Sequence, residues 1–249
     1  YARIALQMND WEKAFNFSDE IIKTSGITLT SKENYILEWE KEEVPISEII
    51  LEFSSPRSSD GSVSSSVSEY FKYESNTNYG KYVTSEDLLD LYEIADIRLN
   101  LFLTENLTTN ITGVEVPLPY YFTKKFQDDA GTTCIRLSEM YLIRAEANAN
   151  VNNESDALID LNTIRKRANL TELTSTNTIL EEIFLERRRE LAFESHLFFD
   201  IARYKKKVVR NKGCLASVCD LDYPSNFFVL PIPDSSIDLN ENIQQNEGY

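Results

Sequence analysis

The sequence has little of what most catalytic and metal-binding motifs require. It contains one histidine, His196, three cysteines and seven scattered glycines. A Ser–His–acid triad or an HExxH zinc site would need that histidine in a context that is missing, and no G-x-S-x-G, P-loop or G-x-G-x-x-G motif occurs. We interpret His196 as a hydrogen-bonded histidine between helices, and we predict no metal, no cofactor and no enzyme activity. Glycoside hydrolysis needs only two carboxylates, but no pair stands out among the 41 acidic residues.

Long apolar runs and positive charge are also scarce. No run of about 18 apolar residues is present, which predicts no membrane-spanning helix. The first residues already have a helical pattern instead of a secretory signal. We therefore expect a fragment whose signal peptide and lipid-bearing cysteine were lost upstream. The net charge of −16 argues against nucleic acid and anionic lipid headgroups as partners, and solubility is the simplest reason for it.

Apolar residues, 42% of the chain, are frequent enough to form a sizeable core. Their spacing by three and four predicts helix pairs at about 1–24, 137–168 and 179–206. The small residues in these pairs resemble tetratricopeptide repeats, with ordinary helical hairpins as the alternative. No internal linker is visible, so we expect residues 1–249 to form one domain.

The segments between the helix pairs have other patterns. We expect a strand at 48–54, a Ser-rich loop at 54–66, a helix at 85–91 and a strand or helix end at 97–103. Residues 106–112 look turn-rich, and residues 117–122 and 223–233 look extended.

Charged and apolar residues alternate at helical spacing in residues 186–204, which read E-R-R-R-E-L-A-F-E-S-H-L-F-F-D-I-A-R-Y. Charges that are half buried in a helix must be paired. We therefore predict a structural lattice of ion pairs between packed helices, and not a catalytic carboxylate pair. Its members are Glu186, Arg189, Glu190, Glu194, Asp200 and Arg203.

The cysteines indicate a small covalent loop. Cys214 and Cys219 are separated by four residues in a loop-like segment, and Cys134 stands alone. A disulfide between the first two is favoured over two free thiols, and it would place the protein in an oxidising compartment.

Three helical segments resemble the SusD/RagB family of outer-membrane nutrient-binding lipoproteins. Residues 186–204 are similar to its E-R-R-x-E-L-A-F-E-G-x-R-F-F-D-L-x-R-W helix, with Ser195 in place of the glycine. Residues 136–147 resemble its R-L-A-E-V-Y-L helix. Residues 160–170 resemble its L-N-x-I-R-x-R-A-G-L helix, with Asn169 in place of the glycine. The C-terminal tail, with its P-I-P and final G-Y, is also similar, so the match covers the C-terminal half to two-thirds of a family member.

The resemblance implies a mainly α, SusD-like fold with tetratricopeptide-like helix pairs, irregular loops and short strands. The ligand side would be the loop-rich segments, about 25–136 and 207–249. It also implies a lipid-anchored protein on the outer face of the outer membrane, with its anchor outside this chain. There it would capture an oligosaccharide, or in some relatives a peptide, and pass it to a SusC/RagA-like TonB-dependent transporter. A helical-repeat module that binds a protein is the alternative.

Sugar-binding sites usually offer flat aromatic faces flanked by a few polar side chains. The densest aromatics outside the predicted helices are Tyr70, Phe71, Tyr73, Tyr79 and Tyr82. Candidate hydrogen-bonding partners beside them are Asn76, Asn78 and Lys81. Second aromatic candidates are Trp39, Tyr120 and Tyr121. Plain core packing is the alternative for each of these rings.

Overall fold

The computed structural model describes residues 1–40, 44–53, 67–111, 113–126, 132–175, 177–214, 218–240 and 242–249. It is 42% helix and 17% strand, which confirms the mainly α prediction. The expected Ser-rich loop at 54–66 lies outside the described residues. Two compact units divide the chain, Tyr1–Leu197 and Phe198–Tyr249. That residues 1–249 form one domain stays a prediction. In the described ranges no helix is long and apolar enough to cross a bilayer.

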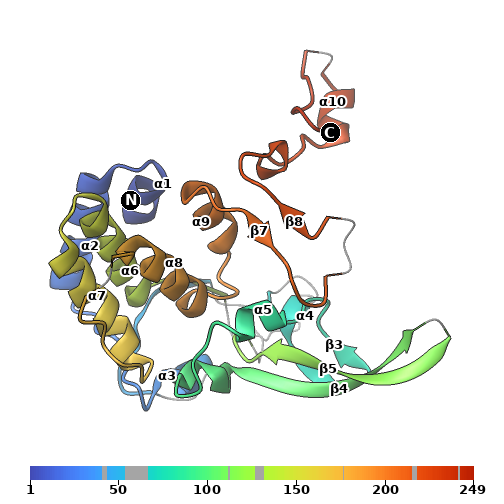
Figure 1. The fold of residues 1–249 in the computed structure, drawn as a ribbon, viewed down its shortest axis with the longest axis horizontal. Coiled ribbons are helices and arrows are strands. Elements are labelled where there is room, and N and C mark those ends of the chain that lie inside the picture. Colours follow the sequence, from blue (N-terminus) through green and yellow to red (C-terminus); the bar gives the residue numbers. More distant parts are fainter. Residues whose placement is uncertain are drawn as a thin grey trace. The chain divides into compact units, whose positions relative to one another are not determined.

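The first unit contains helical hairpins where the sequence predicts the first two pairs (Figure 1). Helices α1 (Ala2–Gln7) and α2 (Trp11–Thr24) form one hairpin, and the Asp10 carboxylate caps α2 by accepting from the Lys13 amide at 3.2 Å. Helices α6 (Leu137–Asn150) and α7 (Glu154–Arg167) form the other. Asn152, at φ 61°, makes the tight turn between α6 and α7 because asparagine tolerates the left-handed conformation.

Helix α6 lies at the centre of the first unit, where it packs against α2, α7 and α8 (Ile179–Glu190). Its alanines Ala145 and Ala149 face Ala157 of α7 within one apolar cluster, so the helices approach closely. A second cluster joins α1, α2 and α6. The third predicted helix pair stays a prediction, because α8 belongs to the first unit and all but the first residue of α9 (Leu197–Arg203) belongs to the second.

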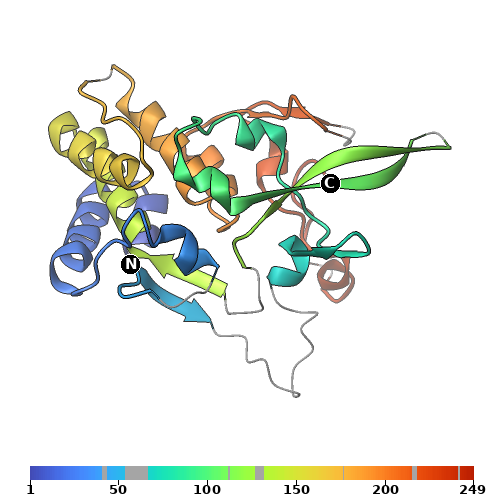
Figure 2. The same cartoon turned by 90° about the horizontal axis from the view of Figure 1, so that it is seen from below.

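Two-stranded antiparallel sheets supply the strands of the first unit. Strand β1 (Ile49–Phe53) lies beside β6 (Thr132–Arg136), as Figure 2 shows. Strands β2 (Tyr73–Ser75) and β3 (Asn78–Tyr79) form a short hairpin. Short helices complete this part of the chain: α3 (Tyr35–Trp39), α4 (Ser68–Phe71), α5 (Glu86–Leu89) and the 3-10 helix η2 (Ile97–Leu101).

The longest hairpin corrects one sequence prediction. Residues 106–112 looked turn-rich, but β4 (Phe102–Ile111) pairs with β5 (Val114–Thr123) without a break in register. The asparagines indicate a turn because asparagine is depleted in strands, but the threonines favour a strand and the cross-strand contacts outweigh the turn signal. Leu107 is buried opposite Leu118.

The second unit is built from short elements. After α9 come β7 (Val208–Val209) and β8 (Asp220–Leu221), which form an antiparallel pair. A 3-10 helix, η4 (Asn226–Phe228), and helix α10 (Asp234–Asp238) follow. The segment 223–233 is thus not extended throughout, because the Ser225 hydroxyl accepts from the Phe227 amide and starts η4.

Candidate functional site

Trp39 is not available to a ligand, which corrects its assignment as a candidate. Its side chain lies in a core cluster with Tyr35, Leu101 and Phe126 and is only 4% exposed. The Lys125 ammonium lies 4.5 Å from the centre of its ring. The indole therefore packs against buried charge and makes no surface platform.

The short β2–β3 hairpin presents one side of its tyrosines to β5. The rings of Tyr73 and Tyr79 lie 5.0 and 5.9 Å from the fully buried ring of Phe122. Tyr73 is half-buried, and its hydroxyl donates to Asn76 Oδ1 at 2.6 Å. Tyr79 remains 46% exposed. Tyr73 thus supports the hairpin, and Tyr79 offers an open ring surface.

A close backbone approach brings Tyr70 and Tyr82 together. The Gly80 amide donates to the Lys72 carbonyl at 2.7 Å, and the Tyr82 amide donates to the Tyr70 carbonyl at 3.0 Å. A Cβ at Gly80 would lie 2.4 Å from the Tyr70 carbonyl oxygen, so only glycine fits there. The rings of Tyr70 and Tyr82 consequently lie 6.0 Å apart at an interplanar angle of 30°, and both are exposed.

We call Tyr70, Tyr79 and Tyr82 the tyrosine surface. Phe71, between them in the chain, turns instead toward the core, with its ring 5.2 Å from that of Phe193. Tyr120 is half-buried, and its hydroxyl lies 2.8 Å from Thr109 Oγ1 on the neighbouring strand. Tyr120 is therefore held within the long hairpin.

The polar candidates lie on the same short hairpin. Asn76, Asn78 and Lys81 are all exposed. The Asn78 amide donates to the Glu74 carboxylate. These side chains can offer hydrogen bonds beside the exposed rings. Flat aromatic faces flanked by such groups suit the C–H faces and hydroxyls of a sugar.

The charged residues of α8 face a buried network of arginines. Glu190 Oε1 accepts from Arg136 Nη1 at 2.5 Å and from Arg167, and Glu190 Oε2 accepts from Arg98 Nη1 at 2.9 Å. Arg98 also donates to Glu186 at 2.7 Å and binds Asp96 through two nitrogens. All these side chains are at most 5% exposed.

The network continues beyond α8 to a lysine and a second shared carboxylate. Lys125 Nζ donates to Glu194 at 2.6 Å and to the backbone carbonyls of Glu190 and Ala192. Glu48 accepts from both Arg136 and Arg167, at 2.6 and 2.8 Å. Arg189 donates to Glu186 at 2.7 Å. We call the residues joined by these contacts the Glu190 network: Glu48, Asp96, Glu186, Glu190, Glu194, Arg98, Lys125, Arg136, Arg167 and Arg189.

The electrostatics of this network favour ionised, unreactive carboxylates. Burial alone would raise the pKa of Glu190, but the neighbouring arginines hold that pKa well below its usual range. Burial would also raise the pKa values of Glu186 and Glu194, but the bases paired with these carboxylates lower them overall. A general acid needs the opposite shift, a carboxyl pKa raised toward the working pH. The arrangement therefore suits a structural role.

The predicted lattice is divided between the two units. Glu186, Arg189, Glu190 and Glu194 belong to the Glu190 network, whereas Asp200 and Arg203 pair with each other at 2.8 Å in the second unit. Sequence reasoning missed the partners Arg98, Arg136 and Arg167. Two of them, Arg136 and Arg167, lie inside motifs that were recognised, so a search for charges within those motifs could have found them.

His196 is buried, and its Nδ1 lies 3.8 Å from the Glu139 carboxylate. Burial lowers the pKa of His196, although Glu139 acts in the opposite direction. Glu139 is itself held by Arg3 at 2.6 Å. In the described parts of the chain no group of three or more His, Cys, Asp or Glu side chains could hold a metal ion.

The C-terminal half of the chain carries the evidence for its family. The sequence pattern of the SusD family matches residues 117–249, more than half of the chain. The chain belongs to the SusD family. This match includes helices α6 to α9 and the arginine and glutamate residues that meet at the centre of the Glu190 network, Arg136, Arg167 and Glu190.

Individual SusD relatives are longer than this chain. Starch-binding protein SusD of Bacteroides thetaiotaomicron is 35% identical over 128 residues, which cover 49% of this chain and 22% of that protein. SusD-like protein P25 of Formosa agariphila is 27% identical over 199 residues, 68% of this chain and 36% of that protein. The chain thus spans well under half the length of these two relatives.

Solved structures of SusD superfamily proteins have the same fold. One from Bacteroides vulgatus matches with a TM-score of 0.79 and 30% identity, covering 100% of this chain and 57% of that one. Another, from Bacteroides thetaiotaomicron, has a TM-score of 0.80 and 28% identity, covering 98% and 58%. These likenesses extend the SusD assignment to the loop-rich residues before position 117.

Proposed function

We propose that this chain is part of a cell-surface subunit that captures oligosaccharides. Membership of the SusD family and the similarity to a starch-binding protein support this proposal. The observation that carries it is the tyrosine surface, where three exposed rings lie on or beside the hairpin that presents Asn76, Asn78 and Lys81. Because stacking on an open surface buries little of a ligand, binding is expected to be weak.

The subunit acts by binding and not by chemistry. The carboxylates of the Glu190 network are paired with bases, and their pKa values are lowered. Incubation with an oligosaccharide that binds should accordingly give no new product by chromatography. Release of shorter sugars by the pure protein, and its loss in Glu190→Gln, would instead point to a glycosidase.

The captured sugar is handed to a SusC/RagA-like TonB-dependent transporter at the outer membrane, where a lipid anchor outside this chain holds the subunit. A polar hollow of about 240 Å³ supports a protein contact on the helix side. Helices α2, α6 and α7 line it with Asp19, Arg144 and Asp160, and Arg144 donates to both carboxylates at 2.7 to 2.8 Å. This hollow also favours the second candidate function, a helical module that binds a protein or peptide.

A screen of immobilised glycans and peptides with the purified chain tests the proposal. We expect saturable binding to one or more neutral oligosaccharides, with starch oligosaccharides as the first probes because of the starch-binding relative. Replacing Tyr79 and Tyr82 by alanine should remove this binding, whereas Tyr1→Ala, at an exposed tyrosine just before α1, should leave it intact. Binding to peptides alone would favour the second candidate.

A further inference from the structure

The charges of the second unit are separated along the chain. Residues 201–219 contain six basic residues and no acidic one, and residues 220–249 contain six acidic residues and no basic one. The basic residues are Arg203, Lys205, Lys206, Lys207, Arg210 and Lys212. In a protein with a net charge of −16, this segment is a local exception. A local cluster of one sign raises the concentration of oppositely charged ligands around it.

We define the basic strip as Lys205, Lys207 and Arg210, which are exposed. Arg203 is excluded because it pairs with Asp200. The strip begins where α9 ends in a tight turn. Lys205 has φ 53° there, and its amide donates to the Ala202 carbonyl at 3.2 Å. It then follows β7 and the loop beyond it, so an ordered backbone supports these cations at both ends of the strand.

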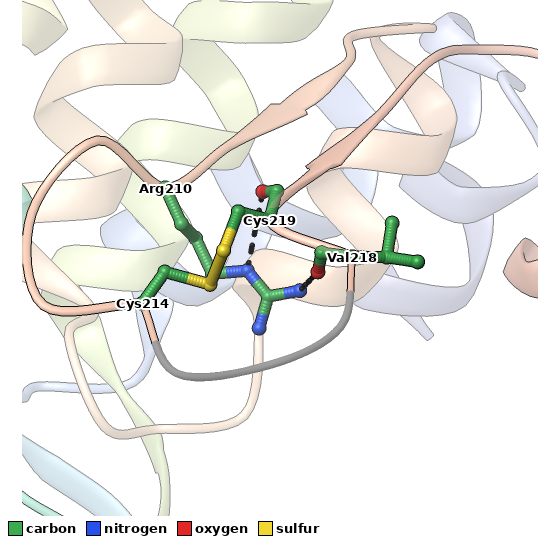
Figure 3. Close-up of a disulfide and its surroundings, with 4 residues drawn as sticks. All are labelled: Arg210, Cys214, Val218 and Cys219. Carbon is green, nitrogen blue, oxygen red and sulfur yellow. Dashed lines mark hydrogen bonds between the residues drawn. A yellow bond between two sulfur atoms is a disulfide. The ribbon is translucent and has the colours of Figure 1, made fainter.

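A disulfide closes the loop at the far end of the strip (Figure 3). Cys214 and Cys219 are joined, and Arg210 bridges to the returning chain by donating to the Val218 carbonyl at 2.7 Å and to the Cys219 carbonyl at 3.4 Å. The guanidinium is thereby positioned while the residue as a whole remains exposed. A cation fixed before a ligand arrives loses less conformational entropy on binding.

Exposed aromatic rings lie at the other end of the β7–β8 pair. Val208 pairs with Leu221, so the chain that follows β8 into Tyr223 runs past the start of β7. The rings of Tyr223 and Phe228 lie 5.5 Å apart, and the ring of Phe198 lies 6.3 Å from that of Phe228. Tyr223 and Phe198 are 37% and 41% exposed. The unit thus combines open rings with a row of cations.

We propose that this part of the second unit binds acidic glycans, sugars that carry carboxylate or sulfate groups. The rings would stack on sugar faces, and the basic strip would pair with the acidic groups. An anionic membrane is a poorer fit, since Asp220 pairs in register with Val209 beside the strip and would repel a flat anionic surface, whereas a linear chain can follow a narrow strip. This site goes beyond the proposed function, because it shares no residue with the tyrosine surface.

Titration of the whole chain with defined glycans tests this proposal. The probes are a chondroitin sulfate oligosaccharide, an oligogalacturonate and neutral maltoheptaose. Binding of at least one acidic probe should weaken strongly between 50 and 500 mM salt, because exposed charge contacts are screened. The variant Lys205→Gln/Lys207→Gln/Arg210→Gln should bind that probe about tenfold more weakly, since each exposed contact contributes a modest part of the affinity. Comparison of the chondroitin sulfate oligosaccharide with the oligogalacturonate shows whether the site binds sulfate or carboxylate groups.

The matched control removes the same charge elsewhere. Lys23→Gln/Lys32→Gln/Lys166→Gln replaces three exposed lysines of the first unit, and its acidic-glycan affinity should stay within about twofold of the parent. An equal loss of acidic-glycan affinity in both triple variants would contradict the proposed site. Failure of both acidic probes to bind would contradict it as well. Binding to vesicles of anionic phospholipid, but to neither glycan, would replace it with a membrane contact.

The tyrosine surface and the basic strip can be tested separately, because each variant should affect the binding of only one class of glycan. The Tyr79→Ala/Tyr82→Ala variant should keep the affinity for the acidic probe, and the basic-strip variant should keep the affinity for a neutral one. If the tyrosine variant alone abolished acidic-glycan binding, one shared site would account for both results and the basic strip would have no role.

Discussion

Arg136 binds Glu190 twice, at the side chain and at the backbone. Its Nη1 donates to the Glu190 carboxylate at 2.5 Å, and its Nη2 donates to the Glu190 carbonyl at 2.6 Å. Arg136 ends β6 and Glu190 ends α8. One guanidinium therefore joins a sheet to the last turn of a helix and satisfies a carbonyl that the helix itself cannot.

Removing the charge of Glu190 should destabilise the protein strongly. Glu190→Gln keeps the shape of the side chain but leaves Arg98, Arg136 and Arg167 with one buried anion fewer. Breaking a buried ion pair by removing one partner typically costs about 3–5 kcal/mol. Urea unfolding followed by circular dichroism would measure the loss in free energy of unfolding.

The control for that experiment is Glu172→Gln, which removes the same charge from an exposed side chain that lies 3.9 Å from Lys166. It should change stability little, because exposed pairs contribute little. If Glu190→Gln were as stable as this control, the Glu190 network would not hold the helices together.

The dependence of stability on acid should differ between these proteins. The pKa of Glu190 is lowered in the folded state because the neighbouring arginines outweigh its burial. Its contribution is therefore complete above the ordinary carboxyl pKa of about 4.3 and is lost as the pH falls from there toward the folded value. Burial lowers the pKa of His196 in the folded state. As the pH falls through the ordinary histidine range, above that of the carboxylates, this residue therefore lowers the stability of both proteins.

Urea midpoints for the parent and Glu190→Gln, measured from pH 7 to pH 3, isolate the effect of this one group. The difference in stability between the two proteins should stay constant above about pH 5 and shrink below about 4.3. A difference that instead grew as the pH fell from 7 to 5 would mean that the folded pKa of Glu190 is raised, which the ion pairs contradict.

Ser195 should accept glycine and reject valine. It is exposed and has φ 65°, in the left-handed region that glycine adopts without strain. A β-branched residue is strained there, so Ser195→Val should lower the free energy of unfolding by about 1–2 kcal/mol. Ser195→Gly should cost nothing measurable, because relief of strain offsets the freedom gained by the unfolded chain. Equal losses in both variants would show that the serine side chain itself stabilises the turn.

Gly80→Ala should disturb the tyrosine surface without a general loss of the fold. The added Cβ would lie 2.4 Å from the Tyr70 carbonyl oxygen, which forces the chain carrying Tyr70 away from that carrying Tyr82. Ligand affinity should fall at least as far as in Tyr82→Ala, while far-ultraviolet circular dichroism stays unchanged. Thr77→Ala, at the exposed tip of the same hairpin, provides the control and should bind normally.

Helices and ion pairs were predictable to different degrees. Local periodicity and caps indicated α2, α6 and α7, because these signals lie within one segment. The same reasoning showed that Glu190 must be paired, yet it could not name Arg98, 92 residues away. Such partners depend on how segments pack, which helical spacing does not encode.

The candidate site was predictable only in part for the same reason. The sequence brought Tyr70, Tyr79 and Tyr82 to attention because they lie close together in the chain. It could not separate them from Trp39, since burial depends on what packs against a ring and not on its neighbours in sequence. The second half of strand β4 was missed because the asparagines indicate a turn, a signal that the cross-strand contacts with β5 outweigh.

Sugar capture by the tyrosine surface can be measured by calorimetric titration of the purified chain with maltoheptaose and with any glycan found in the screen. We expect saturable binding that Tyr79→Ala/Tyr82→Ala abolishes and Tyr1→Ala preserves, without any cleaved product. Binding of equal strength in the tyrosine variant, at an unchanged melting temperature, would contradict the claim that the tyrosine surface captures the sugar.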